Sequence, residues 1–302
     1  MKGTRATTDF GRWWAEVLTL RRTGADQFEA QPSPSAFARM YGGQLAAQSL
    51  LAAAGTVSDE QEPNAVRTVF LRGGDVTRPV TYQVERAHQS RSLSTRLVRA
   101  VQGDRLLATA TASFHRPAAG MSSPLEHETG GVGPAPGPES LPSRPERLAR
   151  RFGEDVPPGA APIWPVDVRY VDRAPWDQAE SGAPAAACNR LWMRAAGQLP
   201  EVPAAHAAAL TFASDYPMFE PVLYPHSIDW AELISGRSVY GASLDHALWF
   251  HRLPRFDEWL LLEQVSPVAA RSRGFSRAEA RAADGRIVAT VAQEVAFTEP
   301  RR

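Results

Sequence analysis

Gln293 is the first of three polar residues in the second half of the chain that could take part in catalysis. It lies in the stretch Ile-Val-Ala-Thr-Val-Ala-Gln-Glu-Val, where the two-residue period of a strand puts it on the apolar face. A similar stretch in the first half of the chain has Ala112 at the equivalent position. A buried amide must be hydrogen-bonded, or it costs ~1–3 kcal/mol. The Gln293 amide is therefore bound either by local backbone or by the polar groups of a site.

Asp215 and Ser243 are the other two. Asp215 ends the apolar stretch Leu-Thr-Phe-Ala-Ser-Asp, so it is either a solvent contact near a helix end or a buried acid. Ser243 has Asp245 and His246 close by, but no Gly-x-Ser-x-Gly motif surrounds it, and adjacent strand residues point to opposite faces. We therefore interpret Ser243 as a hydrogen-bonding hydroxyl. Asp245 and His246 are then a structural pair at a strand start or at the interface between the two halves.

Other kinds of site have little support in the sequence. The seven histidines are scattered and no His-Glu-x-x-His occurs, so we expect no metal site. The single cysteine, Cys188, excludes a disulfide within the chain. The formal net charge is zero, which gives no reason to expect nucleic-acid binding. No signal-peptide core or long apolar segment is found, so we expect a cytoplasmic protein without membrane insertion.

A helix over residues 41–55 is the first element that must position these groups. It opens with Gly42 and Gly43 and is then apolar almost all the way round, apart from two glutamines and a serine. Such a helix is buried rather than amphipathic. The following segments alternate as strands do, so we expect an antiparallel sheet wrapped around this helix. The elements predicted for this half are a helix over 10–21, a short strand over 26–31, and strands over 65–72, 80–87, 92–102 and 106–114.

The second half repeats the first. Phe70-Leu71-Arg72 matches Phe250-His251-Arg252, and Leu-Leu-Ala-Thr at 106–109 matches Ile-Val-Ala-Thr at 287–290. The elements predicted for this half are a second buried helix over 204–219 and strands over 165–171, 190–195, 239–252, 258–265, 272–283 and 287–297. We therefore predict an α+β protein with two copies of one domain, residues 10–117 and 165–299. A Pro- and Gly-rich linker, 118–164, joins them, with a short helix near 145–152.

Several motifs, in order and spacing, resemble the type II acyl-CoA thioesterases of the TesB type. The resemblance covers the chain from about residue 15 to residue 297. The motifs that carry it are Gly42-Gly43-Gln44, Phe70-Leu71-Arg72 followed by Gly-Asp, Thr111-Ala112-Ser113-Phe114, Ser214-Asp215, Pro225-His226, Leu244-Asp245-His246-Ala247-Leu248-Trp249-Phe250-His251-Arg252, Glu258-Trp259-Leu260-Leu261, Ser272-Arg273-Gly274-Phe275 and Gln293-Glu294.

This resemblance implies a double hotdog fold and hydrolysis of acyl-CoA to fatty acid and CoA, without a cofactor. It also implies an Asp, a Thr or Ser, and a Gln that hold and activate a water, and these roles fall on Asp215, Ser243 and Gln293. A homo-oligomer of double-hotdog chains is a further expectation from the family. Asp215 is then the general base, and the other two side chains orient the water.

Substrate contacts are predicted less directly. The backbone N–H groups of Gly42 and Gly43, at a helix N-terminus, suit a developing oxyanion. The surface residues Arg91, Arg271 and Arg273 are candidates for the CoA phosphates.

One departure from the family concerns Arg67, which stands where the family usually has His, so no role of that His can be carried over. Two other functions stay open. A non-catalytic acyl-CoA or acyl-carrier binding module predicts ligand binding without hydrolysis. A hotdog hydratase or dehydratase is the weaker alternative, because that chemistry needs an Asp/His pair near the start of a hotdog helix and residues 41–48 contain neither.

Overall fold

The computed structural model describes residues 9–32, 39–118, 134–156, 164–177, 185–226 and 240–298. Its α-helices are α1 (Phe10–Leu18), α2 (Gly42–Ala54), α3 (Arg144–Phe152), α5 (Pro203–Asp215) and α6 (Glu220–Leu223). Short 3-10 turns lie at η1 (Pro138–Ser140), η2 (Pro175–Asp177), η3 (Pro217–Phe219) and η4 (Tyr224–His226).

Several strands, among them Leu93–Gln102 and Arg273–Ala282, alternate between buried and less buried positions, as the sequence predicts. In the first half they are β1 (Arg21–Gly24), β2 (Gln27–Ala30), β3 (Glu62–Phe70), β4 (Val80–Gln89), β5 (Leu93–Gln102) and β6 (Arg105–His115). In the second half they are β7 (Val166–Tyr170), β8 (Cys188–Ala195), β9 (Tyr240–Ser243), β10 (Asp245–Phe250), β11 (Leu260–Ala270), β12 (Arg273–Ala282) and β13 (Ile287–Thr298).

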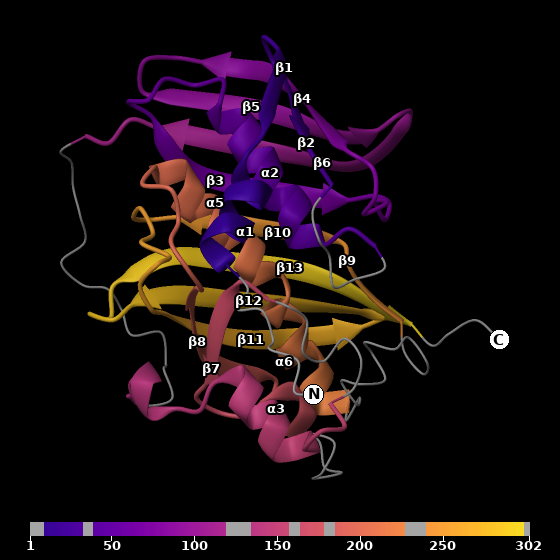
Figure 1. Cartoon of the computed structure of the whole chain (residues 1–302), viewed down its shortest axis with the longest axis vertical. Helices are drawn as coiled ribbons and strands as arrows, with labels where there is room; N and C mark the ends of the chain where they lie inside the picture. Colours follow the sequence, from indigo (N-terminus) through magenta and orange to yellow (C-terminus); the bar gives the residue numbers. More distant parts are fainter. Residues whose placement is uncertain are drawn as a thin grey trace, which may run out of the picture.

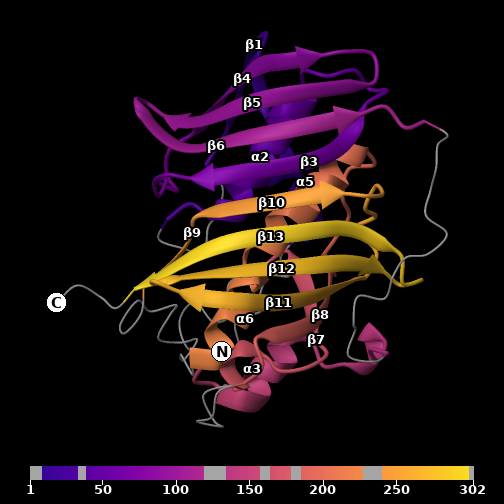
Figure 2. The same ribbon diagram turned by 180° about the vertical axis from the view of Figure 1, so that it is seen from behind.

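These strands form one continuous antiparallel sheet in the described part of the chain. Its order is β1-β2-β4-β5-β6-β3-β10-β13-β12-β11-β8-β7, with β9 paired to β13. The two halves join where β3 pairs with β10, in a register that sets Val66 opposite Leu248. Figure 2 shows the joined sheet from its outer side, with the helices behind it.

The two central helices pack against each other on the inner side of the sheet (Figure 1). Nearly every residue of α2 and of α5 is buried, because Ala and Leu both favour helix and leave no polar face to hydrate. Gln48, a polar exception in α2, is hydrogen-bonded at both ends of its amide: it donates to the Val17 carbonyl at 2.8 Å and accepts from the Tyr82 hydroxyl at 2.6 Å. This side chain therefore ties α1 and β4 to the first central helix.

Several predicted elements differ from the structure. The helix expected over 10–21 ends at Leu18, and Arg21 begins β1. The strand expected over 258–265 runs from Leu260 to Ala270 as β11. The short strand expected at 26–31 is the second arm of a β1–β2 hairpin. The helix expected over 204–219 ends at Asp215, and the residues after it form 3-10 and α-helical turns instead. The strand expected over 239–252 is two strands, β9 and β10, with Leu244 between them. The last two differences affect the positions of Asp215 and Ser243, which are described next.

Candidate active site

Asp215 is the centre of a hydrogen-bonded cluster between the two halves. Its side chain is 3% exposed, so it is a buried acid and not a solvent contact. The Gly43 N–H donates to its Oδ2 at 2.8 Å, and the Ser243 hydroxyl donates to its Oδ1 at 2.9 Å. Gln293 Nε2 donates to the Asp215 main-chain carbonyl at 3.1 Å and to Ser243 Oγ at 3.0 Å. The structure therefore brings together Asp215, Ser243 and Gln293.

The contact between Gly43 and Asp215 depends on how the two helices meet. The first N–H groups of α2 have no acceptor within the helix, and the N-terminal end of a helix favours a negative charge. The end of α5 supplies that charge from the other half of the chain. A Cβ atom on Gly43 would lie 2.4 Å from the Phe212 carbonyl oxygen and 2.6 Å from the Tyr41 ring. Only glycine lets the two helix ends approach this closely.

Tyr41 reinforces the same junction. Its hydroxyl donates to the Phe212 carbonyl at 2.8 Å and accepts from the Tyr216 N–H at 2.9 Å. These two backbone groups flank Asp215 one helical turn apart. The N-terminal end of α2 thus fixes the last turn of α5 through both a side chain and a backbone amide.

Ser243 reaches the cluster through an irregularity in the sheet. Ser243 pairs with Val295, and Ala247 pairs with Ala292. The chain therefore advances four residues from Ser243 to Ala247, whereas β13 advances only three between their partners. The extra residue, Leu244, is a β-bulge. Residues that lie directly opposite each other share a face, and Val295 is fully buried, so the bulge turns Ser243 to the inner face.

The bulge also separates the neighbours of Ser243. Asp245 lies on the outer side, where its Oδ2 is 2.9 Å from Arg67 Nη2 and its Oδ1 accepts from the Glu294 N–H. His246 lies on the inner side, with Nε2 3.0 Å from Ser214 Oγ. Asp245 is thus a structural residue at the interface between the halves, as predicted, but it is not paired with His246. Arg67 is half of that interface contact and points away from the cluster.

His246 lies beside the Asp215 cluster, whereas the sequence indicated only a structural pair with Asp245. It is fully buried, and that burial lowers its pKa below 6.5, although the Asp215 charge acts in the opposite direction. The ring is therefore neutral at physiological pH. A comparison of the two halves could have found it, because Val66 stands at the equivalent position.

The predicted phosphate contacts are spread over two places. Arg271 and Arg273 belong to the β11–β12 hairpin, whose two-residue turn has positive φ at Arg271 and Ser272. This hairpin lies at the end of the sheet that carries Ser243, because Arg273 pairs with Ala296. Arg91 lies elsewhere: its carbonyl contacts Gln61, in the segment that follows the C-terminal end of α2. The structure does not bring Arg91 to the cluster.

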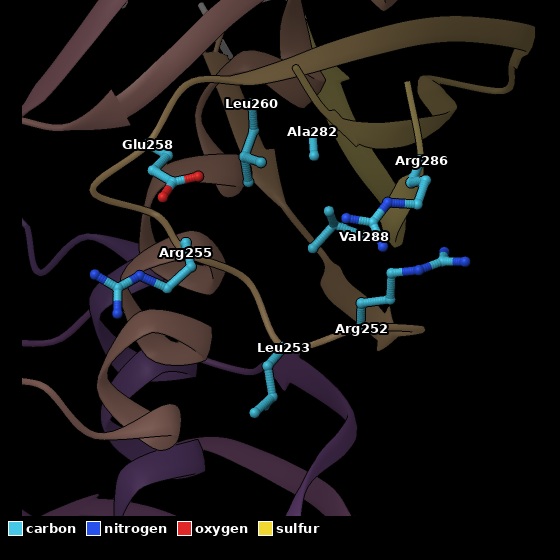
Figure 3. Close-up of a pocket in the computed structure, with 8 residues that line it drawn as sticks. All are labelled: Arg252, Leu253, Arg255, Glu258, Leu260, Ala282, Arg286 and Val288. Atoms are coloured by element: carbon cyan, nitrogen blue, oxygen red, sulfur yellow. The ribbon is translucent and has the colours of Figure 1, made fainter. Parts of the chain in front are cut away.

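A pocket of about 270 Å³ lies at the other end of α5 (Figure 3). Arg252 and Arg286 are on one side of it, and Arg255 on the other. Arg255 also pairs with Asp257, beside the first turns of α5. Helix geometry puts the N-terminal end of α5 roughly 18 Å from Asp215. Ala282 lines the pocket. By strand register its counterpart in the first half is Gln102, whose amide bonds the Asp75 backbone. We therefore do not assign the chemistry to this pocket.

The described residues contain no group of three or more His, Cys, Asp or Glu side chains that could hold a metal ion. Within the same ranges, no helix is long and apolar enough to cross a membrane.

Two helices, each enclosed by an antiparallel half-sheet, with an acid held between them, define a double hotdog protein. Solved structures have the same fold. A hot dog fold protein from Alicyclobacillus acidocaldarius aligns with a TM-score of 0.73 at 21% identity, over 95% of this chain and 98% of the other.

Family models and sequence relatives identify the family. Residues 31–115 match the acyl-CoA thioesterase N-terminal domain, and residues 137–297 match the C-terminal domain. Human acyl-coenzyme A thioesterase 8 is 32% identical over 92% of this chain and 86% of its own length. Acyl-CoA thioesterase II TesB2 from Mycobacterium marinum is 30% identical with a TM-score of 0.73, over 95% of this chain and 98% of the other. The chain belongs to the acyl-CoA thioesterase family and is a thioester hydrolase by that membership.

Proposed function

We propose that the chain hydrolyses acyl-CoA to a free fatty acid and CoA, with Asp215 as the general base for a bound water. The observation that carries this proposal is the chain of donors from Gln293 through Ser243 to Asp215. A thioester carbonyl is a good electrophile, so a positioned base and an oxyanion donor are sufficient for its hydrolysis.

The free hydrogen-bonding capacity of the cluster supports a position for the proposed water. The Ser243 hydroxyl gives its proton to Asp215 and accepts one bond from Gln293, so one acceptor site on Oγ is left. The Asp215 carboxylate likewise keeps lone pairs beyond the two that Ser243 and Gly43 use. A water that donates one O–H to each of these two oxygens directs its lone pair away from the cluster, toward the thioester.

The reaction then balances with these groups. The water oxygen bonds to the carbonyl carbon while its proton passes to Asp215, and the carbonyl electrons form an oxyanion. The intermediate collapses, the C–S bond breaks, and Asp215 returns the proton to the CoA sulfur. The Gly43 N–H is committed to Asp215, so the Gly42 N–H, another amide of the first turn of α2, is the proposed oxyanion donor.

The further features of the proposal concern the surroundings of the site. Arg271 and Arg273 remain candidate phosphate contacts because they lie at the same end of the sheet as Ser243. The domain limits of 10–117 and 165–299, a cytoplasmic location and a homo-oligomer also stay predictions.

Thiol release from acyl-CoAs of several chain lengths tests the activity. We expect turnover that depends on chain length. If no acyl-CoA is hydrolysed but acyl-CoA raises the melting temperature, the chain is a binding module and the proposed function is wrong.

A further inference from the structure

His246 is a buried polar group for which the proposed reaction has no role. It is fully buried on the inner face of β10. Its Nε2 lies 3.0 Å from the hydroxyl of Ser214, the residue directly before Asp215. In the β10–β13 pair, Ala247 lies opposite Ala292. His246 precedes Ala247 on β10, and Gln293 follows Ala292 on the antiparallel strand β13. His246 and Gln293 are therefore cross-strand neighbours next to the general base.

The first half of the chain shows that the fold does not require polar groups at this position. The equivalent cross-strand pair there is Val66 and Ala112, which lie directly opposite each other and are both buried. The second half thus carries an imidazole and an amide where the first half has two apolar side chains. Both polar residues occur in the half that also supplies Asp215 and Ser243, which links them to the site rather than to the sheet.

The Gln293 amide has an orientation problem that its neighbour can solve. The amide supports Ser243 only when Nε2, and not Oε1, faces the hydroxyl. Gln293 Oε1 and His246 Nδ1 are both buried, and neither meets hydrogen-bond geometry with any group in the described ranges. His246 Nδ1 can donate a hydrogen bond and Gln293 Oε1 can accept one, so these two groups on neighbouring side chains complement each other.

We propose that His246 is a positioning residue, whose ring accepts from Ser214 at Nε2 and donates from Nδ1 to Gln293 Oε1. The Ser214 hydroxyl has one proton, which then goes to Nε2 at 3.0 Å rather than to the Thr211 carbonyl at 3.4 Å. The bond from Nδ1 to Oε1 fixes which end of the amide faces Ser243, and the contact with Ser214 holds the turn that carries Asp215. The inference rests on the proposed function, because it assigns Gln293 its donor role in that reaction.

Three variants test the inference through steady-state thiol release from one acyl-CoA substrate. His246→Leu removes both ring nitrogens, and we expect kcat to fall about tenfold or more with KM unchanged, as for the loss of one well-placed hydrogen bond. His246→Asn keeps a donor near the place of Nδ1, so we expect it to retain most of the kcat. His246→Gln keeps a polar group near the place of Nε2 instead, and we expect a fall close to that of His246→Leu.

His206 provides the matched control. Among the described residues, His206 is the other buried histidine, and it is 3% exposed. It lies on α5, near the opposite end of the helix from Asp215, and accepts from the Phe256 N–H at 3.2 Å. His206→Leu removes a buried imidazole in the same way, so we expect it to lower the melting temperature while kcat stays within about twofold.

The outcomes separate the two claims. Wild-type turnover with an unchanged kcat in His246→Leu overturns the positioning role and leaves the proposed function intact. Equal kcat values for the Asn and Gln variants also overturn it, and this comparison holds even where His246→Leu does not fold. Wild-type protein without turnover on any acyl-CoA overturns both. In a Gln293→Ala background, we expect that His246→Leu does not lower kcat any more. This result supports the claim that His246 acts through Gln293.

Discussion

Replacement of Gln293 by alanine removes a side chain whose contribution can be worked out from its contacts. The fold should accept the change, because the first half of the chain has Ala112 at the equivalent buried position. The lost groups are the Nε2 donors to Ser243 Oγ at 3.0 Å and to the Asp215 carbonyl at 3.1 Å. Each net hydrogen bond contributes ~0.5–1.5 kcal/mol.

If both bonds persist in the transition state, their loss raises the barrier by about 1–3 kcal/mol. This corresponds to a fall in kcat of about 5- to 150-fold. KM should change little, because neither bond is made to substrate. The assay is thiol release under saturating acyl-CoA, at a temperature well below the melting temperature of each variant.

Gln264 is a matched control for this variant. It is a glutamine on β11, 3% exposed, and neither atom of its amide has a hydrogen-bond partner among the described residues. Gln264→Ala deletes the same volume from the same sheet, so we expect an altered melting temperature and an unchanged kcat. The reasoning is refuted if Gln293→Ala keeps kcat within twofold of wild type, or if Gln264→Ala lowers kcat equally.

Three other changes have expected outcomes. Ser243→Ala loses the hydroxyl between the amide and the acid, so kcat for thiol release should fall about tenfold or more, while Ser243→Thr keeps the hydroxyl and most of the rate. Gly43→Ala forces a Cβ against the Phe212 carbonyl, so thermal unfolding should show a loss of about 1–3 kcal/mol, and kcat should fall with it. Burial raises the pKa of Glu220 from 4.5 to about 7, so the folded protein binds this proton more tightly than the unfolded chain. Stability should therefore fall as pH rises from about 4.5 to about 7, by on the order of 3 kcal/mol. In Glu220→Gln this loss should be absent, which melting temperatures at pH 5 and pH 8 check.

The elements that the sequence predicts well are those with a strong local signal. The helices α2 and α5 are composed largely of Ala and Leu, and β6 alternates apolar and polar residues. The repeat itself drew attention to the Gln293 amide, because a polar residue at a core position of one copy is conspicuous beside Ala112 of the other. The same comparison, applied to Val66, points to His246.

The features that were missed arise from contacts between distant segments. Neither Gly nor Pro marks Leu244, so the bulge that turns Ser243 inward has no local sequence signal. The bond from the Gly43 amide to Asp215 joins the N-terminal end of one helix to the C-terminal end of another, 172 residues apart in sequence. Because the acid uses that amide, the predicted pair of oxyanion donors is reduced to Gly42 in the proposed reaction.

The role of Asp215 as general base is the central claim, and Asp215→Asn tests it most directly. The amide keeps the shape of the carboxylate but cannot accept the proton of the water. We predict that kcat for thiol release falls by about 10²–10⁴-fold, while the outward-facing control Asp245→Asn keeps the wild-type kcat. An Asp215→Asn protein that is folded and retains kcat within about threefold of wild type contradicts the account.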